Sequence, residues 1–443
     1  MNKIEENAPI APTLKQAFWY WLKLGFISFG GPAGQIAIMH KDLVEDKRWI
    51  SEKRFLHALN YCMVLPGPEA QQLATYIGWL MHKTRGGLLA GGLFVLPSLF
   101  ILMLLSYIYM RFGDVPAVAG VLYGIKPAVV AIVLFAAYRI GARALKNKAL
   151  WAIAAASFLA ITLLKLPFPL IVGLAALIGY LGNRFVATLF ASGGGHKAAD
   201  KNFGKAVIDD NTPTPAHAHF SWHSLVKFLL IGMAIWLAGM ALLTALYGWQ
   251  AVYTQMAWFF TKAALLTFGG AYAVLPYVYQ GAVTHYVWLT PTQMMDGLAL
   301  GETTPGPLIM VVAFVGFVGG WQHAMVYSPL VSAMLAACIV TFFTFLPSFI
   351  FIFMGAPFIE STKNNLKLTA PLTAITAAVV GVIVALALFF ALHVFWPNRV
   401  NIDWLAMLAA ALGFMALFKF KVSTVKLIGV FALLGLAHNY LLM

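Results

Sequence analysis

Two Pro-Gly-Pro triplets are the residues best suited to chemistry in this apolar sequence. They are Pro66-Gly67-Pro68 and Pro305-Gly306-Pro307. In each, the first proline ends a helix, the glycine allows a tight turn and the last proline can open the next helix. Such a break leaves unpaired backbone amides at a helix N-terminus. These amides and the helix dipole together attract an anion. The triplets therefore predict an anion site, with a simple kink or tight loop as the alternative.

A second pair of breaks contains glycine pairs, at Gly30-Gly31 and Gly269-Gly270, which would let the backbone approach a ligand closely. Hydroxyl and ammonium groups precede both pairs at the same spacing: Ser28 and Thr267, Lys23 and Lys262. Each lysine either joins the anion path or extends from its helix toward a polar surface. The other binding candidates adjoin the Pro-Gly-Pro triplets: Gln71, Thr303 and Thr304.

Two acidic residues also adjoin the triplets, Glu69 after the first and Glu302 before the second. A carboxylate beside an anion site is repelled unless it is protonated, and burial favours the protonated form. Both residues are therefore candidates for carrying a coupled proton. His57 and Asp296 also occupy matched positions, and we expect them at the mouth of the same segments.

The elements that position these residues must be membrane helices. The chain of 443 residues is 61% hydrophobic and only 10% charged, whereas soluble domains carry about 25% charged residues. Nine stretches approach the roughly 20 apolar residues that span a bilayer: Leu88–Met110, Val115–Ala137, Leu150–Leu164, Phe168–Asn183, Leu225–Tyr247, Pro329–Met354, Leu368–Val394, Trp404–Phe418 and Val425–Leu442. We expect no cleaved signal peptide, because Met1–Lys15 lacks an apolar core and contains acidic residues.

The sequence contains an internal repeat. Adding 239 to a residue number takes Trp49-Ile50-Ser51 to Trp288-Leu289-Thr290, and takes the first Pro-Gly-Pro triplet to the second. Farther along, Leu96-Pro97-Ser98 matches Leu346-Pro347-Ser348 with an offset of 250, which implies an insertion near 322–328. Ser51 and Thr290 are predicted helix N-caps, with Pro291 at the first helical position. The segments around each triplet are too short to span, so we expect a hairpin that enters and leaves on one side.

The charges of matched loops differ. Residues 40–54 hold five basic residues, whereas their counterparts 280–293 hold none. Cytoplasmic loops collect Lys and Arg, so the two halves should face opposite sides of the membrane. The fold class expected is an all-α polytopic protein with two inverted repeats and broken or re-entrant half-helices. The domains expected are an N-terminal repeat (1–190), a polar cytoplasmic linker (191–223), and a linking span with the C-terminal repeat (224–443).

The same charge rule accounts for the net charge of +14 better than nucleic-acid binding does. The two cysteines, Cys62 and Cys338, lie in apolar runs and indicate neither a disulfide framework nor a zinc site. A solvated linker explains the three histidines of 217–223 better than a metal cluster. We therefore expect no metal, no cofactor and no nucleic-acid partner. The bilayer and an anionic substrate are the expected partners, and a homodimer stays open.

These motifs resemble the chromate ion transporter family in its long, two-domain bacterial form. The resemblance rests on Phe29-Gly30-Gly31-Pro32-Ala33-Gly34-Gln35, on Leu65-Pro66-Gly67-Pro68 with Gln71, Leu73, Tyr76 and Gly78, and on Glu302-Thr303-Thr304-Pro305-Gly306-Pro307. It covers both halves. It implies chromate efflux across the bacterial cytoplasmic membrane, chromate resistance and a duplicated, inverted fold. Some relatives carry a histidine where this chain has Gly34-Gln35, which leaves the substrate within the family open.

Export fits the energetics of an interior-negative cell, because a dianion that leaves gains about 4.6 kcal/mol per 100 mV. No phosphate-binding loop for ATP occurs in the sequence. Sulfate or another tetrahedral oxyanion is the alternative substrate. A membrane-bound chromate reductase is the alternative of another class, but two isolated cysteines and no dinucleotide fingerprint argue against it. Paired broken helices are typical of alternating access, so an ion channel is the less favoured alternative.

Overall fold

The computed structural model describes residues 9–185, 203–213, 215–268, 270–361, 369–397 and 401–441. Throughout these residues the regular elements are helices, apart from one isolated bridge between Ile50 and Ile208. Seven helices are long and apolar enough to cross a membrane: α4 (Glu69–Phe112), α5 (Pro116–Ala144), α7 (Phe168–Phe185), α9 (Trp222–Tyr247), α14 (Pro329–Ser361), α15 (Thr369–Phe395) and α17 (Thr424–Leu441). The predicted all-α polytopic class is thereby confirmed.

Two of the nine predicted spans are shorter than the others. Helices α6 (Lys148–Thr162) and α16 (Trp404–Phe418) have 15 residues each. At about 1.5 Å per residue, neither reaches across a hydrocarbon layer of about 30 Å by itself. Helix α16 coincides with its predicted run, and α6 is shifted by two residues from the predicted Leu150–Leu164.

Matched segments of the two halves form matching elements. The pairs are α1 (Leu14–Ile27) with α10 (Val252–Leu265), α2 (Gly31–His40) with α11 (Ala271–Tyr279), η1 (Lys41–Asp46) with η3 (Gln280–His285), and α3 (Glu52–Cys62) with α12 (Pro291–Thr303). Even the irregular backbone repeats, because Arg48 and Val287, 239 positions apart, have positive φ angles of 50° and 53°. The predicted N-caps are confirmed. The Ser51 side chain accepts from the amide of Arg54, and Thr290, which directly precedes Pro291, forms a capping box.

Helix α4 is a hairpin of two helices rather than one rod. His82 and Lys83 leave the helical conformation, and Gly78 and Gly86 then pack backbone to backbone. In the second half, α13 (Val311–Gln322) folds back on α14 in the same way, with Gly320 against Ala336. The connection 323–328 is longer there, where the change of offset predicted an insertion.

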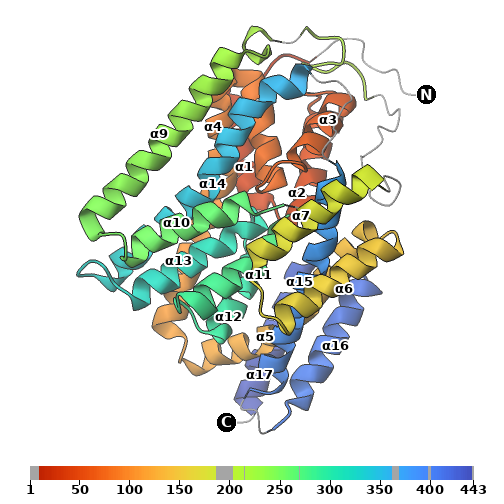
Figure 1. Ribbon diagram of the computed structural model, residues 1–443. Coiled ribbons are helices and arrows are strands. Elements are labelled where there is room, and N and C mark those ends of the chain that lie inside the picture. Colours follow the sequence, from red (N-terminus) through yellow and green to blue (C-terminus); the bar gives the residue numbers. More distant parts are fainter. Residues whose placement is uncertain are drawn as a thin grey trace.

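Helices of each half pack against helices of the other half. Helix α5 of the first half packs against α16 and α17 of the second, whereas α15 of the second half packs against α6 and α7 of the first (Figure 1). Gly124 of α5 meets Gly435 of α17, and Gly179 of α7 meets Ala374 of α15. Such exchanged pairs are expected of two units related by a two-fold axis. The direction in which each half faces the membrane stays a prediction.

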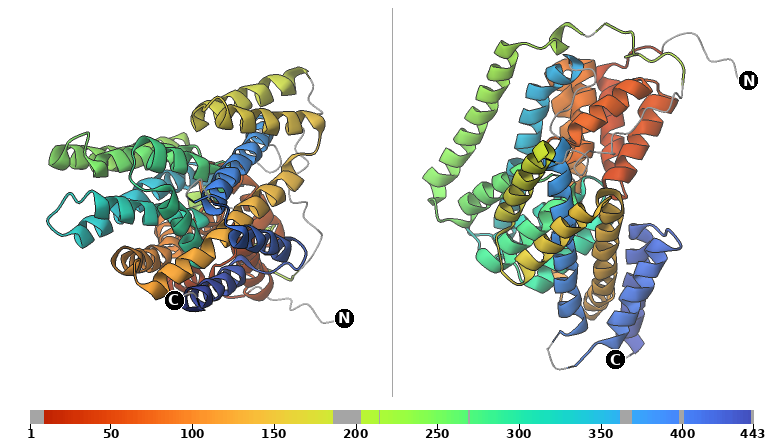
Figure 2. Two further views of the ribbon diagram at one scale, coloured as in Figure 1. Left: turned by 90° about the horizontal axis from the view of Figure 1, so that it is seen from below. Right: turned by 45° about the vertical axis from the view of Figure 1, so that its right-hand side comes forward.

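The connection between the halves contacts the first half. Helix α9 lies along the outside of the molecule, as the two views of Figure 2 also show. Before it, the amide of Val207 donates to Arg48 O (2.9 Å) and the amide of Ser51 donates to Ile208 O (3.0 Å). Ile208 and Ala218 are buried in the core of the first half. The described part of the linker is therefore docked rather than fully solvated.

Candidate functional site

Both Pro-Gly-Pro triplets interrupt helices. Helix α3 ends at Cys62 and α4 begins at Glu69, directly after Pro68. In the second half, α12 ends at Thr303, and a 3-10 turn, η4 (Leu308–Met310), separates Pro307 from α13. Gly67 and Gly306 have φ angles of 130° and 99°, which only glycine adopts readily. The predicted breaks are confirmed, and the helix start differs between the two triplets.

Each triplet is joined to the glycine break of the other half. The amide of Gly67 donates to Thr267 O (2.8 Å), and the amide of Gly306 donates to Ser28 O (2.9 Å). These two bonds exchange under the repeat offset, so the same contact is made twice. Gln35 Nε2 also donates to Ser28 O (3.3 Å) and to Gly306 O. The predicted site residues of the two breaks are thus brought together across the halves.

Two serines that the sequence did not suggest as site residues lie against the triplets. A Cβ added to Gly67 would collide with Ser348 Oγ, and one added to Gly306 would lie 2.8 Å from Ser98 Cβ. Ser98 and Ser348 are the matched serines of the repeat. The space beside these two glycines is therefore occupied by the serines. The repeated Leu-Pro-Ser motif was the available signal, but only the fold shows where it lies.

Several buried polar atoms around these loops have no hydrogen-bond partner: Ser28 Oγ, Gln71 Oε1, Gln72 Oε1, Ser98 Oγ and Ser348 Oγ. All five side chains are at most 1% exposed. Buried polar atoms are almost always satisfied by protein, water or a ligand. This concentration therefore indicates that water or a polar ligand occupies the region.

The hydroxyls of the three threonines predicted as site residues already donate hydrogen bonds to carbonyls within the chain. Thr267 donates to Ala263 O (2.7 Å), and Thr303 and Thr304 donate to carbonyls of α12 at 2.8 and 2.9 Å. In this arrangement they cannot also donate to an anion. Thr267 therefore meets the triplet through its backbone carbonyl, which accepts from the Gly67 amide, and not through the expected hydroxyl donor.

The glycine pairs border open space. Gly31 and Gly270 have φ angles of 69° and 97°, and a Cβ added to either would meet nothing within 4 Å. Gly30 also has a positive φ angle, and Gly269 lies outside the described residues. The predicted interruption is confirmed, since α1 ends at Ile27 and α2 begins at Gly31.

The two predicted lysines lie at the surface of their helices. Lys23 is exposed, and the ammonium of Lys262 stands 5.4 Å from the ring centroid of Trp258. Within the described ranges, neither has a recorded contact with a Pro-Gly-Pro triplet. This placement fits extension toward an interface, with the cation held over an aromatic ring.

The acidic candidates have different surroundings. Tyr272 of α11 donates its hydroxyl to Glu302 Oε1, whereas the Glu69 carboxyl lies near the Cys62 thiol. Asp296 accepts from the Tyr109 hydroxyl at 3.0 Å, and its other oxygen is buried without a partner.

The matched residue of Asp296, His57, bonds Ile359 O at 3.0 Å. Tyr109 and Ile359 are themselves matched by the offset of 250. His57 and Asp296 thus each connect a broken helix to the end of a long helix from the other half.

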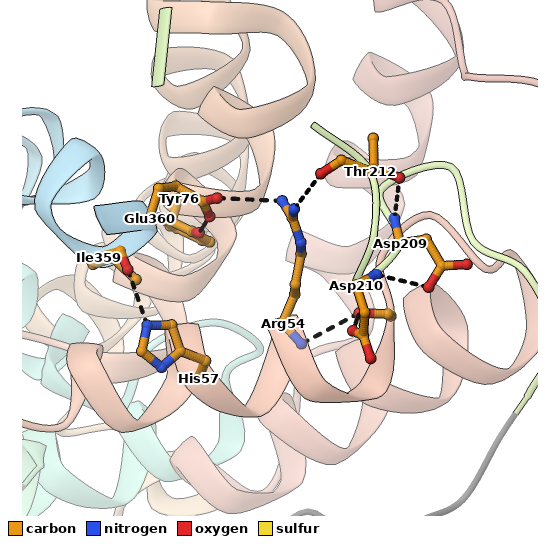
Figure 3. A network of polar contacts seen from close by, with 9 residues as sticks. Arg54, His57, Tyr76, Asp209, Asp210, Thr212, Ile359 and Glu360 are labelled. Carbon is orange, nitrogen blue, oxygen red and sulfur yellow. Dashed lines mark hydrogen bonds and ion pairs between the residues drawn. The ribbon is translucent and has the colours of Figure 1, made fainter. Parts of the chain in front are cut away.

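A polar network closes one end of the first half (Figure 3). Arg54 Nη1 pairs with Glu360 Oε2 at 3.2 Å, and Arg54 Nη2 donates to Thr212 O at 2.6 Å. Tyr76 donates its hydroxyl to the other oxygen of Glu360. Sequence reasoning missed this network, because its members come from α3, α4, the linker and α14.

Comparison with known proteins identifies the family. The sequence profile described as Chromate transporter matches residues 15–180 and 254–436. The chromate transport protein of Cupriavidus metallidurans is 30% identical over 436 residues, which cover 97% of this chain and 94% of the relative. That of Pseudomonas aeruginosa is 32% identical over 425 residues, covering 96% and 92%.

A probable chromate transport protein of Synechococcus elongatus is 29% identical over 84% of this chain and 83% of the relative. No solved structure matches. The relatives are named as transport proteins, which agrees with a role other than catalysis, and the apolar helices make the chain a multi-pass membrane protein. Because the profile covers both halves, this chain belongs to the chromate transporter family.

Proposed function

We propose that this protein is a secondary transporter that exports chromate across the cytoplasmic membrane of a bacterium and so confers chromate resistance. Two of the relatives named above are named chromate transport proteins, and their similarity to this chain covers nearly their whole length. A dianion that leaves an interior-negative cell gains about 4.6 kcal/mol at 100 mV, so the membrane potential suffices to drive export. Sulfate or another tetrahedral oxyanion is the alternative cargo, and it shares the same charge and shape.

The observation that supports the site best is the double exchange of bonds between the Pro-Gly-Pro triplets and the opposite breaks, with unpaired buried polar atoms around them. Substrate sites of inverted-repeat transporters lie where discontinuous helices of the two repeats meet. Neutral donors and helix ends bind the anion here, and no guanidinium is required. A neutral site holds a dianion without trapping it, which suits release on the far side.

Alternating access follows from two halves that are inverted in the membrane. The proposed inversion rests on the basic residues of 40–54 and their absence from 280–293. In this arrangement the Arg54–Glu360 network faces the cytoplasm, and the Tyr109–Asp296 contact faces outward. Glu302 and Glu69 are the proposed carriers of coupled protons, since each adjoins a triplet.

Export is tested by the amount of chromium retained in cells. Cells that produce the protein and cells that carry an empty vector are loaded with radiolabelled chromate, then diluted into chromate-free medium. Faster loss of label from the producing cells, together with growth at higher chromate, is the expected result. Equal loss in both strains, or greater accumulation in the producing strain, would contradict export. A reductase would instead retain the label inside as reduced chromium.

A further inference from the structure

We infer that the two Pro-Gly-Pro triplets are not equivalent, and that the oxyanion is bound at the first one, by the opening amides of α4 and the Ser348 hydroxyl contributed by the other half. The inference deepens the proposed function and rests on it. Neither Ser348 nor the inequality of the triplets follows from the repeat, which matches the triplets residue for residue.

The first triplet opens directly into a helix. The amide of Gln72 donates to Pro68 O (2.9 Å), which completes the first turn of α4. Among the described residues, no acceptor is recorded for the amides of Glu69, Ala70 and Gln71. Three unpaired amides at the positive end of a helix dipole are a ready site for an anion.

Unpaired side chains converge on the same point, which makes it a built site rather than a bare helix end. Ser348 and Gln72 both lie against Gly67, and their side chains are 1% and 0% exposed. Gln72 Nε2 donates to Pro66 O (2.8 Å) and so holds the loop, while its oxygen has no partner. The free hydroxyl of Ser348 can donate to an oxyanion held by the amides. Gln72 is therefore a positioning residue, and Ser348 is the contact residue.

The second triplet differs from the first in its helix start and its side chains. The turn η4 follows Pro307, and the amide of Met310 is already bonded to Pro307 O (2.9 Å). The offset of 239 takes Gln71 and Gln72 to Met310 and Val311, which have apolar side chains. Two polar side chains lie at this loop: Ser98, the counterpart of Ser348, and Gln35, whose Nε2 already donates to Gly306 O. Among the described residues, the second triplet thus keeps the turn and its bond to Ser28, but it has one fewer free amide and no glutamine at the start of its helix.

The matched serines give a controlled test. Radiolabelled chromate binding to the purified, detergent-solubilised protein is measured by equilibrium dialysis for the wild type, Ser348→Ala and Ser98→Ala. Loss of a hydrogen bond to a charged ligand weakens binding about tenfold or more, so the Kd of Ser348→Ala should rise at least that far. The Kd of Ser98→Ala should stay within about twofold of wild type. Both variants remove one hydroxyl beside a glycine, so their effects on folding are matched, and thermal unfolding verifies this.

Gln72→Met provides a second variant of the first triplet. It should weaken chromate binding and also speed amide hydrogen exchange at Gly67, because the bond to Pro66 O is lost. Equal effects of the two serine variants, a larger effect of Ser98→Ala, or no effect of Ser348→Ala would overturn the inference. If the wild type binds sulfate but not chromate, the proposed cargo fails, and the same serine comparison made with sulfate still decides between the triplets.

Discussion

The ion pair between Arg54 and Glu360 should couple the two halves of the chain energetically. The charged atoms are 3.2 Å apart, and the side chains are only 10% and 6% exposed. At an effective dielectric constant of about 20, this separation gives a gross attraction of about 5 kcal/mol. Desolvation of both groups offsets much of it, so the expected net coupling is about 2 kcal/mol.

The perturbation is a double-mutant cycle with Arg54→Met, Glu360→Gln and the double variant. Each single change leaves a buried partner unsatisfied and should cost about 3 kcal/mol of unfolding free energy. The double variant should cost about 2 kcal/mol less than the sum, because no unpaired charge then remains. Tyr76→Phe is the control, since it removes a second donor to Glu360 but keeps the ion pair.

The assay is reversible unfolding in mixed micelles with increasing SDS, followed by tryptophan fluorescence and circular dichroism. The free energies of the four proteins are compared at one SDS fraction inside the transition. Additivity of the two single variants within about 0.5 kcal/mol would refute the coupling. It would mean that the contact contributes nothing to holding α3 against the end of α14.

Three further outcomes are expected. Cysteines at Lys53 and Thr292, matched and both exposed, should react with an impermeant thiol reagent from opposite sides of the membrane, and labelling of both in intact cells would refute the inversion. Glu302→Gln should abolish the pH dependence of chromate flux but keep chromate binding, and an unchanged pH profile would exclude Glu302 as the proton carrier. Burial, and then the charge of Lys83, lower the pKa of His217 below 6.5, although its bond to Trp79 O opposes this. Docking of the linker is therefore complete above about pH 6.5 and weakens as the pH falls through the lowered pKa of His217. Hydrogen exchange of residues 205–218, corrected for the intrinsic rate, should accelerate below pH 6.5. A corrected rate that does not depend on pH would contradict this effect.

Features set by local backbone chemistry were predictable from the sequence. Proline and glycine restrict or free the φ angle, so the breaks at Gly67 and Gly306 and the N-cap at Thr290 were predicted at the right residues. The apolar runs predicted the long helices, because a bilayer demands them. The repeat predicted that matching elements would recur.

Contacts between distant segments were not predictable in this way. Arg54 and Glu360 are separated by 306 positions, and only the packing of α14 beside α4 brings them together. Ser348 belongs to a repeated motif, yet its position against the triplet of the other half depends on the exchange of helices. The Thr267 hydroxyl was expected to face a ligand, but a helix carbonyl four residues earlier offers a nearer acceptor.

We propose that this chain moves chromate outward, driven by the membrane potential, through a neutral site at the first Pro-Gly-Pro triplet. The most direct test is the flux of radiolabelled chromate from proteoliposomes under an imposed potassium-diffusion potential, negative on the side corresponding to the cytoplasm. The wild type should release chromate faster as the potential grows, and Ser348→Ala should be slow while Ser98→Ala is not. Chromate release that matches protein-free liposomes at every potential would contradict potential-driven export by this chain.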